Sequence, residues 1–152
     1  MSGRIGTLLP PPLIYLCFIQ LAWGLGDLLP LPLPDNRPTR LAGWGLIALG
    51  LALAGWTVWQ MLRQRTTLNP YGTPARLLQE GPFRLSRNPV YLADTLIYSG
   101  IGLLLASLWP WLLLPLLILC MNRAVIQHEE QLLKGLFGND YQAYARRVRR
   151  WI

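Results

Sequence analysis

Two polar clusters stand beside long apolar stretches of the chain, and together they could bind a small charged ligand. The first is the basic loop Gly81–Tyr91 (GPFRLSRNPVY), which runs directly into an apolar stretch. The second is His128-Glu129-Glu130, at the point where the next apolar stretch stops. Arginine forks and free amides at a helix start bind carboxylates, and carboxylates match an ammonium group or ribose hydroxyls. The two clusters therefore predict a zwitterionic ligand, provided that the surrounding elements bring them together.

The elements that carry these clusters are predicted to be membrane helices. Of the 152 residues, 53% are hydrophobic and 14% are charged, whereas soluble domains have about a quarter charged residues. Uncharged runs extend over residues 7–26, 41–62 and 95–122. Because a bilayer-spanning helix needs about 20 apolar residues, we expect an all-α integral membrane protein.

Four transmembrane helices are predicted in a single domain, 1–152. An apolar segment over 90–127 would be about 57 Å long as one helix, far beyond a hydrocarbon core of about 30 Å, so Trp109-Pro110-Trp111 is expected to divide it. Alternating prolines in 31–38 predict a linker, and small residues such as Gly50 and Gly55 predict close helix packing. The expected spans are about 12–29, 41–62, 90–108 and 111–127, with a catalytic loop over 63–89 and a cytoplasmic tail over 128–152 that forms short interfacial helical segments interrupted by Gly138.

The distribution of basic residues supports four spans. With four spans, the N-terminus, the loop 63–89 and the tail share one side of the membrane. That side carries twelve of the fourteen Lys and Arg residues, since only Arg37 and Arg40 lie opposite. Cytoplasmic loops are enriched in Lys and Arg, so both termini and both polar clusters are predicted to face the cytoplasm. Three or five spans would scatter these charges.

Other interpretations of the same residues remain open. A net charge of +7 is also found in nucleic-acid-binding proteins, but anionic lipid headgroups explain it better in a membrane chain, and no nucleic-acid partner is expected. Cys17 and Cys120 lie alone in apolar runs and predict structural thiols, with no metal site. Glu129 and Glu130 could pair with Arg87 or Arg123 to lock helices together. The alternative function is therefore a small non-catalytic membrane scaffold or transporter subunit.

Several short motifs resemble one family of membrane enzymes in order and spacing. The chain resembles the isoprenylcysteine carboxyl methyltransferase and phospholipid methyltransferase superfamily over about residues 66–152. S-adenosylmethionine carries all the groups expected of the ligand, together with a sulfonium methyl. The motifs are Gly81-Pro82-Phe83-Arg84, Arg87-Asn88-Pro89-Val90-Tyr91, Glu129-Glu130-Gln131-Leu132-Leu133, and Phe137-Gly138-Asn139-Asp140-Tyr141 with Tyr144.

The resemblance implies an S-adenosylmethionine site at the cytoplasmic ends of the last two spans. It implies direct methyl transfer to a lipophilic acceptor from the bilayer, either an isoprenylcysteine-like carboxylate or a phospholipid amine, in a bacterial inner membrane protein. Arg87 and Glu130 are the expected catalytic residues. The expected cofactor-binding residues are Gly81, Pro82, Arg84, Asn88, Pro89, Tyr91, Glu129, Glu130, Tyr141 and Tyr144.

Asn88, Ala93 and Asp94 depart from the usual pattern of the family. Asn88 stands where the prenylcysteine enzymes have His and the phospholipid enzymes have Asn, and Ala93 stands where Gly is common. Asp94 lies one heptad after Arg87, and it is expected to be either an extra charge in the site or a partner for that arginine.

His128 is expected at the membrane interface, with proton acceptance as a second role. The acceptor and the oligomeric state stay open.

Overall fold

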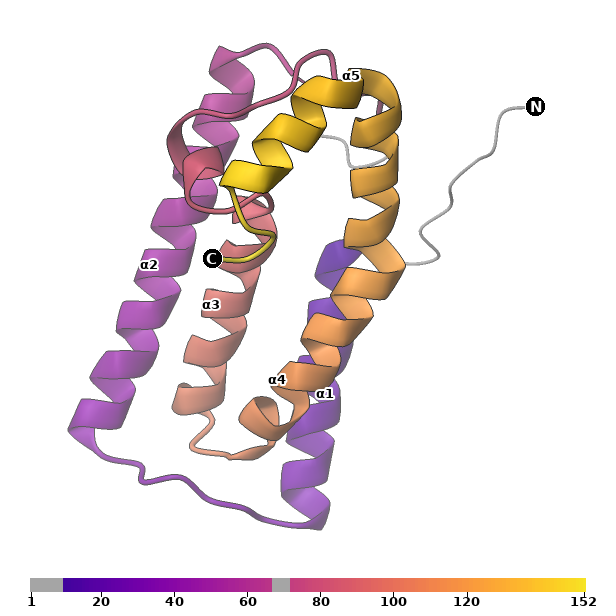
Figure 1. Ribbon diagram of the computed structural model, residues 1–152. Helices are drawn as coiled ribbons and strands as arrows, with labels where there is room; N and C mark the ends of the chain where they lie inside the picture. Colours follow the sequence, from indigo (N-terminus) through magenta and orange to yellow (C-terminus); the bar gives the residue numbers. More distant parts are fainter. Residues whose placement is uncertain (1–9, 67–71) are drawn as a thin grey trace.

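The computed structural model describes residues 10–66 and 72–152, so Arg4 lies outside the described residues. All regular secondary structure in the described chain is helical, apart from one isolated β-bridge between Pro32 and Ser107. The α1–α2 and α3–α4 connections lie at one end of the bundle, and η1 and α5 lie at the other (Figure 1). The elements are α1 (Pro11–Leu28), α2 (Arg37–Arg63), the 3₁₀-helix η1 (Gly81–Arg84), α3 (Pro89–Leu104), α4 (Trp109–Met121), the π-helical turn η2 (Asn122–Ile126) and α5 (Gln127–Arg147).

Within residues 10–66 and 72–152, three helices are long and apolar enough to cross a membrane: α1, α2 and the continuous helix Trp109–Arg147. The predicted third span is α3, whose 16 residues extend about 24 Å, less than a hydrocarbon core of about 30 Å. Large apolar side chains such as Trp44, Leu51 and Trp59 are more than half exposed on the outside of the bundle. An apolar exterior of this kind favours a lipid environment over water.

The second helix begins earlier than predicted, at Arg37 instead of about residue 41. The side chain of Asn36 accepts a hydrogen bond from the amide of Thr39 at 3.0 Å, which satisfies a helix-start donor. Pro38 then occupies the first turn, where its missing N–H has no consequence. The predicted linker over 31–38 therefore ends at Asn36.

The third helix ends earlier than predicted, at Leu104 instead of about residue 108. The chain turns at Ala106, whose φ is 48°, and then pairs with the α1–α2 linker. The amide of Leu33 donates to the carbonyl of Ala106 at 2.7 Å, and the amide of Leu108 donates to the carbonyl of Leu31 at 2.8 Å. Sequence periodicity could not reveal this pairing between distant segments.

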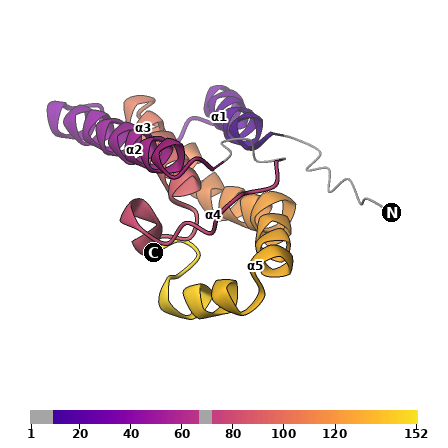
Figure 2. The ribbon, with the colours of Figure 1, turned by 90° about the horizontal axis from the view of Figure 1, so that it is seen from above.

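The fourth helix does not stop at residue 127. Residues 109–126 form the more apolar part of this candidate span, and α5 continues the helix without a break through η2. The expected separate tail over 128–152 is therefore wrong in its first part. Helix α5 is kinked at Gly138, with φ 49° and ψ −118°, where the sequence predicts an interruption. The rest of α5 curves back toward the 81–88 segment (Figures 1 and 2).

Helix α3 is held against α2 by glycines and against α1 and α4 by tyrosines. A Cβ at Gly50 would lie 2.8 Å from the carbonyl oxygen of Ala93, whereas one at Gly55 would meet nothing within 4 Å. The predicted close packing thus involves Gly50 and not Gly55. On the other side, the Tyr15 hydroxyl donates to the carbonyl of Tyr91 at 3.0 Å. These contacts fix the height of α3, whose first turn carries the site.

Candidate active site

The segment before α3 turns the chain so that Arg87 faces α5 and Asn88 faces the residues that follow α5. Gly81 adopts φ 60°, a conformation that glycine reaches without strain, and Pro82 is fully buried behind it. The Ser86 hydroxyl then accepts a hydrogen bond from the amide of Asn88 at 3.0 Å. Gly81 and Pro82 therefore shape the loop. Arg84 is exposed and does not line the cavity described below.

A cavity of about 200 Å³ lies between the start of α3, the end of α2 and the first half of α5. Six predicted site residues line it; five come from the two polar clusters, and Tyr144 comes from the second half of α5. The remaining walls are mostly apolar and come from α2, from residues 72–78 and from α5. The six residues are Arg87, Asn88, Pro89, Tyr91, Glu129 and Tyr144; apolar neighbours include Met61, Leu77, Leu78, Leu132 and Leu133.

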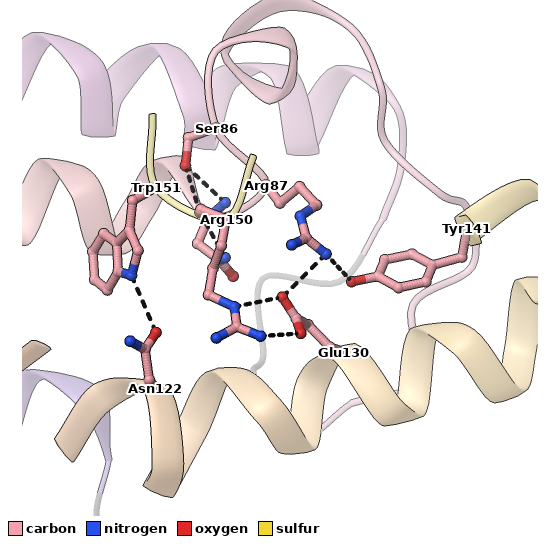
Figure 3. Close-up of polar contacts among 8 residues, drawn as sticks. Ser86, Arg87, Asn122, Glu130, Tyr141, Arg150 and Trp151 are labelled. Carbon is pink, nitrogen blue, oxygen red and sulfur yellow. Dashed lines mark hydrogen bonds and ion pairs between the residues drawn. The ribbon is translucent and has the colours of Figure 1, made fainter. Parts of the chain in front are cut away.

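The guanidinium of Arg87 is fixed by two groups of α5 (Figure 3). Its Nη1 donates to the Tyr141 hydroxyl at 3.0 Å and lies 3.1 Å from Oε1 of Glu130. The Arg87 side chain is 15% exposed, and among the described residues its buried Nε has no partner. Asp94 does not form an ion pair with Arg87 in the described structure, because Glu130 takes that place. Because Arg87 lines the cavity, its positive charge favours an anionic group there.

The two neighbouring glutamates have different surroundings. Glu129 lines the cavity and accepts a hydrogen bond of 2.6 Å from the Tyr91 hydroxyl. Burial raises the pKa of Glu129 to about 7; the Tyr91 hydrogen bond lowers it, and the charge of Glu130 raises it. Glu130 does not line the cavity and instead accepts two hydrogen bonds from Arg150, at 2.9 and 2.7 Å. The hydrogen bonds with Glu130 raise the pKa of Arg150.

The first turn of α3 offers free backbone donors. In the described structure the amides of Val90 and Tyr91 meet no backbone acceptor, and the first bond of the helix runs from the amide of Leu92 to the carbonyl of Asn88. The Asn88 side chain does not cap the helix, because its Nδ2 donates to the carbonyl of Arg150 at 3.0 Å. Free amides at a helix start bind anions.

The second half of α5 closes the site from above. Tyr141 and Tyr144 are buried and pack edge to face with their ring centroids 6.3 Å apart. The Tyr144 hydroxyl donates to the carbonyl of Phe83 at 2.7 Å, which ties α5 to the loop before α3. Tyr144 lines the cavity directly, whereas Tyr141 acts on it through Arg87. His128 is exposed.

Sequence reasoning missed Ser86 and the last residues of the chain. The Ser86 hydroxyl donates to the carbonyl of Arg150 at 3.0 Å, and the Trp151 indole donates to Oδ1 of Asn122 at 3.1 Å. The sequence contains only a weak signal for them, since Arg149-Arg150-Trp151 reads as part of a basic tail. Their pairing with residues at least twenty positions earlier is visible only in the folded chain.

Comparison with known proteins gives the family. An uncharacterized protein from Haemophilus influenzae is 36% identical to the chain over 63 residues, which is 41% of this chain and all of that protein. No solved structure matches. The family model for phospholipid methyltransferases matches residues 38–140. This match covers about two thirds of the 152 residues, and the chain therefore belongs to the phospholipid methyltransferase family.

Proposed function

We propose that the protein is an S-adenosylmethionine-dependent methyltransferase that methylates a lipophilic acceptor at the cytoplasmic face of a bacterial inner membrane. Family membership supports methyl transfer to a lipid-like substrate. The cavity is the observation that supports a cofactor site. One space of about 200 Å³ is lined by Arg87 and Asn88 from one polar cluster and by Glu129 from the other. Arg37 and Arg40 stand at the opposite end of the bundle from these residues, in keeping with the positive-inside rule.

The lining residues fit the cofactor's polar groups. Its carboxylate is complemented by the positive charge of Arg87, which lines the cavity, and by the free amides of Val90 and Tyr91. Its ammonium group or ribose hydroxyls are complemented by Glu129, the glutamate that lines the cavity. Ligand pockets usually measure about 300–1,000 Å³, so we expect the wall formed by residues 72–78 to move outward on binding.

Bound S-adenosylmethionine would supply an activated methyl group on a sulfonium. The chain's own contribution is to position the reactants and to exclude water, which together account for much of the acceleration of such a transfer. Met61, Leu132 and Leu133 form a dry wall that an acceptor from the bilayer can approach. A carboxylate acceptor needs no base. An amine acceptor must be neutral, and Glu129 with its raised pKa is the lining group suited to take the proton.

The experiment that tests this function is a binding and transfer measurement on the full chain in nanodiscs. Calorimetry should detect S-adenosylhomocysteine binding to the wild type, with weaker binding for Asn88→Ala. Transfer of a labelled methyl group into a total lipid extract, followed by mass spectrometry, then distinguishes a carboxylate ester from a methylated amine. Absence of binding and transfer would refute the proposal and favour a scaffold in which Arg87 and Glu130 only lock helices.

A further inference from the structure

The last five residues of the chain, which we call the C-terminal arm (Val148–Ile152), run along the segment just before α3. Helix α5 ends at Arg147, and Val148 takes an extended conformation with φ −121° and ψ 128°. The amide of Arg87 donates to the carbonyl of Arg149 at 3.0 Å. The next carbonyl, that of Arg150, accepts from the Ser86 hydroxyl and from Nδ2 of Asn88, both at 3.0 Å. Successive arm carbonyls therefore bond three consecutive residues of the site segment.

The side chain of Arg150 forms the second attachment (Figure 3). Its Nε and Nη2 bind the two carboxylate oxygens of Glu130 at 2.9 and 2.7 Å, in the fork geometry that only arginine provides. Glu130 in turn lies 3.1 Å from Nη1 of Arg87. The three side chains are between 15% and 31% exposed. Such a partly buried pair is stronger than an exposed one, because water and salt screen it less.

The third attachment joins the arm to the membrane helix. The Trp151 indole donates to Asn122, the first residue of the π-helical turn η2. The arm thus connects the start of α3 with the helix that carries both glutamates. The side chain of the neighbouring Arg149 is exposed.

We propose that Arg150 is a positioning residue for the cofactor site. Its side chain binds Glu130, which in turn fixes the guanidinium of Arg87. Its backbone carbonyl binds the Asn88 side chain and holds it away from the start of α3. The amides of Val90 and Tyr91 therefore stay free for the ligand. This inference rests on the proposed function. It assigns Glu130 to the anchoring of the arm and leaves Glu129 as the glutamate that contacts the ligand.

Arm docking and cofactor binding are therefore coupled, and the coupling is reciprocal. Loss of the Arg150 side chain should weaken S-adenosylhomocysteine binding by at least about tenfold, which corresponds to about 1.4 kcal/mol. Ligand binding to the wild type should slow amide hydrogen exchange in the peptide that contains the C-terminal arm. Helix α2 begins at the opposite end of the bundle from α5 (Figure 1), and its first turns should exchange equally with and without ligand.

The test compares Arg150→Gln with Arg149→Gln, which removes the same charge one residue earlier from an exposed side chain. Calorimetry with S-adenosylhomocysteine in nanodiscs should give at least a tenfold weaker affinity for Arg150→Gln and less than a twofold change for Arg149→Gln. Arg150→Lys keeps the charge without the fork and should bind with intermediate affinity. Equal affinities for Arg150→Gln and wild type would overturn the proposal, as would exchange in the wild-type arm that the ligand does not change.

The outcomes also separate this proposal from the proposed function. If the wild type does not bind S-adenosylhomocysteine, the proposed function itself fails. If the wild type binds and Arg150→Gln binds equally well, the function stands and the positioning role is wrong. The exchange measurement needs no substitution, so the proposal remains testable even if Arg150→Gln does not fold.

Discussion

Gly50→Ala should separate α2 from α3 and thereby disturb the site that the two helices support. A Cβ at Gly50 would lie 2.7 Å from Cγ1 of Ile97 and 2.8 Å from the carbonyl oxygen of Ala93, whereas ordinary contacts begin at 3.4 Å. The backbone oxygen cannot rotate away, so the helices must separate locally by about 0.6 Å, the difference between 3.4 and 2.8 Å. Overpacking of this kind destabilises a protein by about 1–3 kcal/mol.

The matched control is Gly55→Ala on the same helix, because a Cβ there would meet nothing within 4 Å. Both substitutions gain about 1 kcal/mol of helix propensity, so this term cancels when the two variants are compared. Gly50→Ala should then be about 1–3 kcal/mol less stable than Gly55→Ala. For a chain of this size the difference corresponds to about 2–12 °C in Tm, measured by thermal unfolding in detergent. Equal Tm values for the two variants would refute the packing of α2 against α3.

Three substitutions near the cavity test the roles of individual groups. Burial raises the pKa of Glu129 to about 7, so its carboxylate forms as the pH rises from 6 to 8. S-adenosylhomocysteine binding by the wild type, measured by calorimetry, should strengthen over that pH range. Glu129→Gln should remove this pH dependence. The same raised pKa means that protonated Glu129 stabilises the folded protein fully below pH 4.5, and that this stabilisation is lost as the pH rises through about 7. The melting temperature of the unliganded protein should therefore fall as the pH rises over this range, and Glu129→Gln should remove this decrease. Tyr91→Phe removes a hydrogen bond that lowers the pKa of Glu129, so the pH midpoint of binding should move upward, and an unchanged midpoint would contradict the contact. Tyr144→Phe leaves the carbonyl of Phe83 without its hydrogen bond and should destabilise the protein by about 1 kcal/mol in the same melting assay.

The helices that begin with strong local signals could be predicted from the sequence. Pro11 and Pro12 start α1, and the Asn88-Pro89 pair starts α3, within one or two residues of the predicted positions. The meeting of the Arg87–Tyr91 segment with Glu129 also followed from the count of spans, since antiparallel neighbours joined by a tight turn must bring these ends together. The local chemistry of proline and the length of the apolar runs were sufficient for these predictions.

The features that depend on distant pairing could not be predicted. His128-Glu129-Glu130 is typical of the end of a span, yet the helix continues to Gly138. Glu129 is bonded to Tyr91 of α3, and Glu130 pairs with Arg87 and with Arg150 of the C-terminal arm. The different roles of Glu129 and Glu130 follow from 100° of rotation around that helix, and the charges alone do not distinguish them. Arg84 and Arg87 are equally basic in sequence, and only the turn at Ser86 directs one to solvent and the other to the cavity.

The most direct test of the central claim is calorimetric titration of the wild-type chain in nanodiscs with S-adenosylhomocysteine, with Glu129→Gln and Arg149→Gln as comparisons. We predict one binding site per chain, weakened at least about tenfold by Glu129→Gln, which is about 1.4 kcal/mol, and changed less than twofold by Arg149→Gln. Absence of saturable binding to the wild type, or equal weakening by both substitutions, would contradict a cofactor site formed by the start of α3 and Glu129.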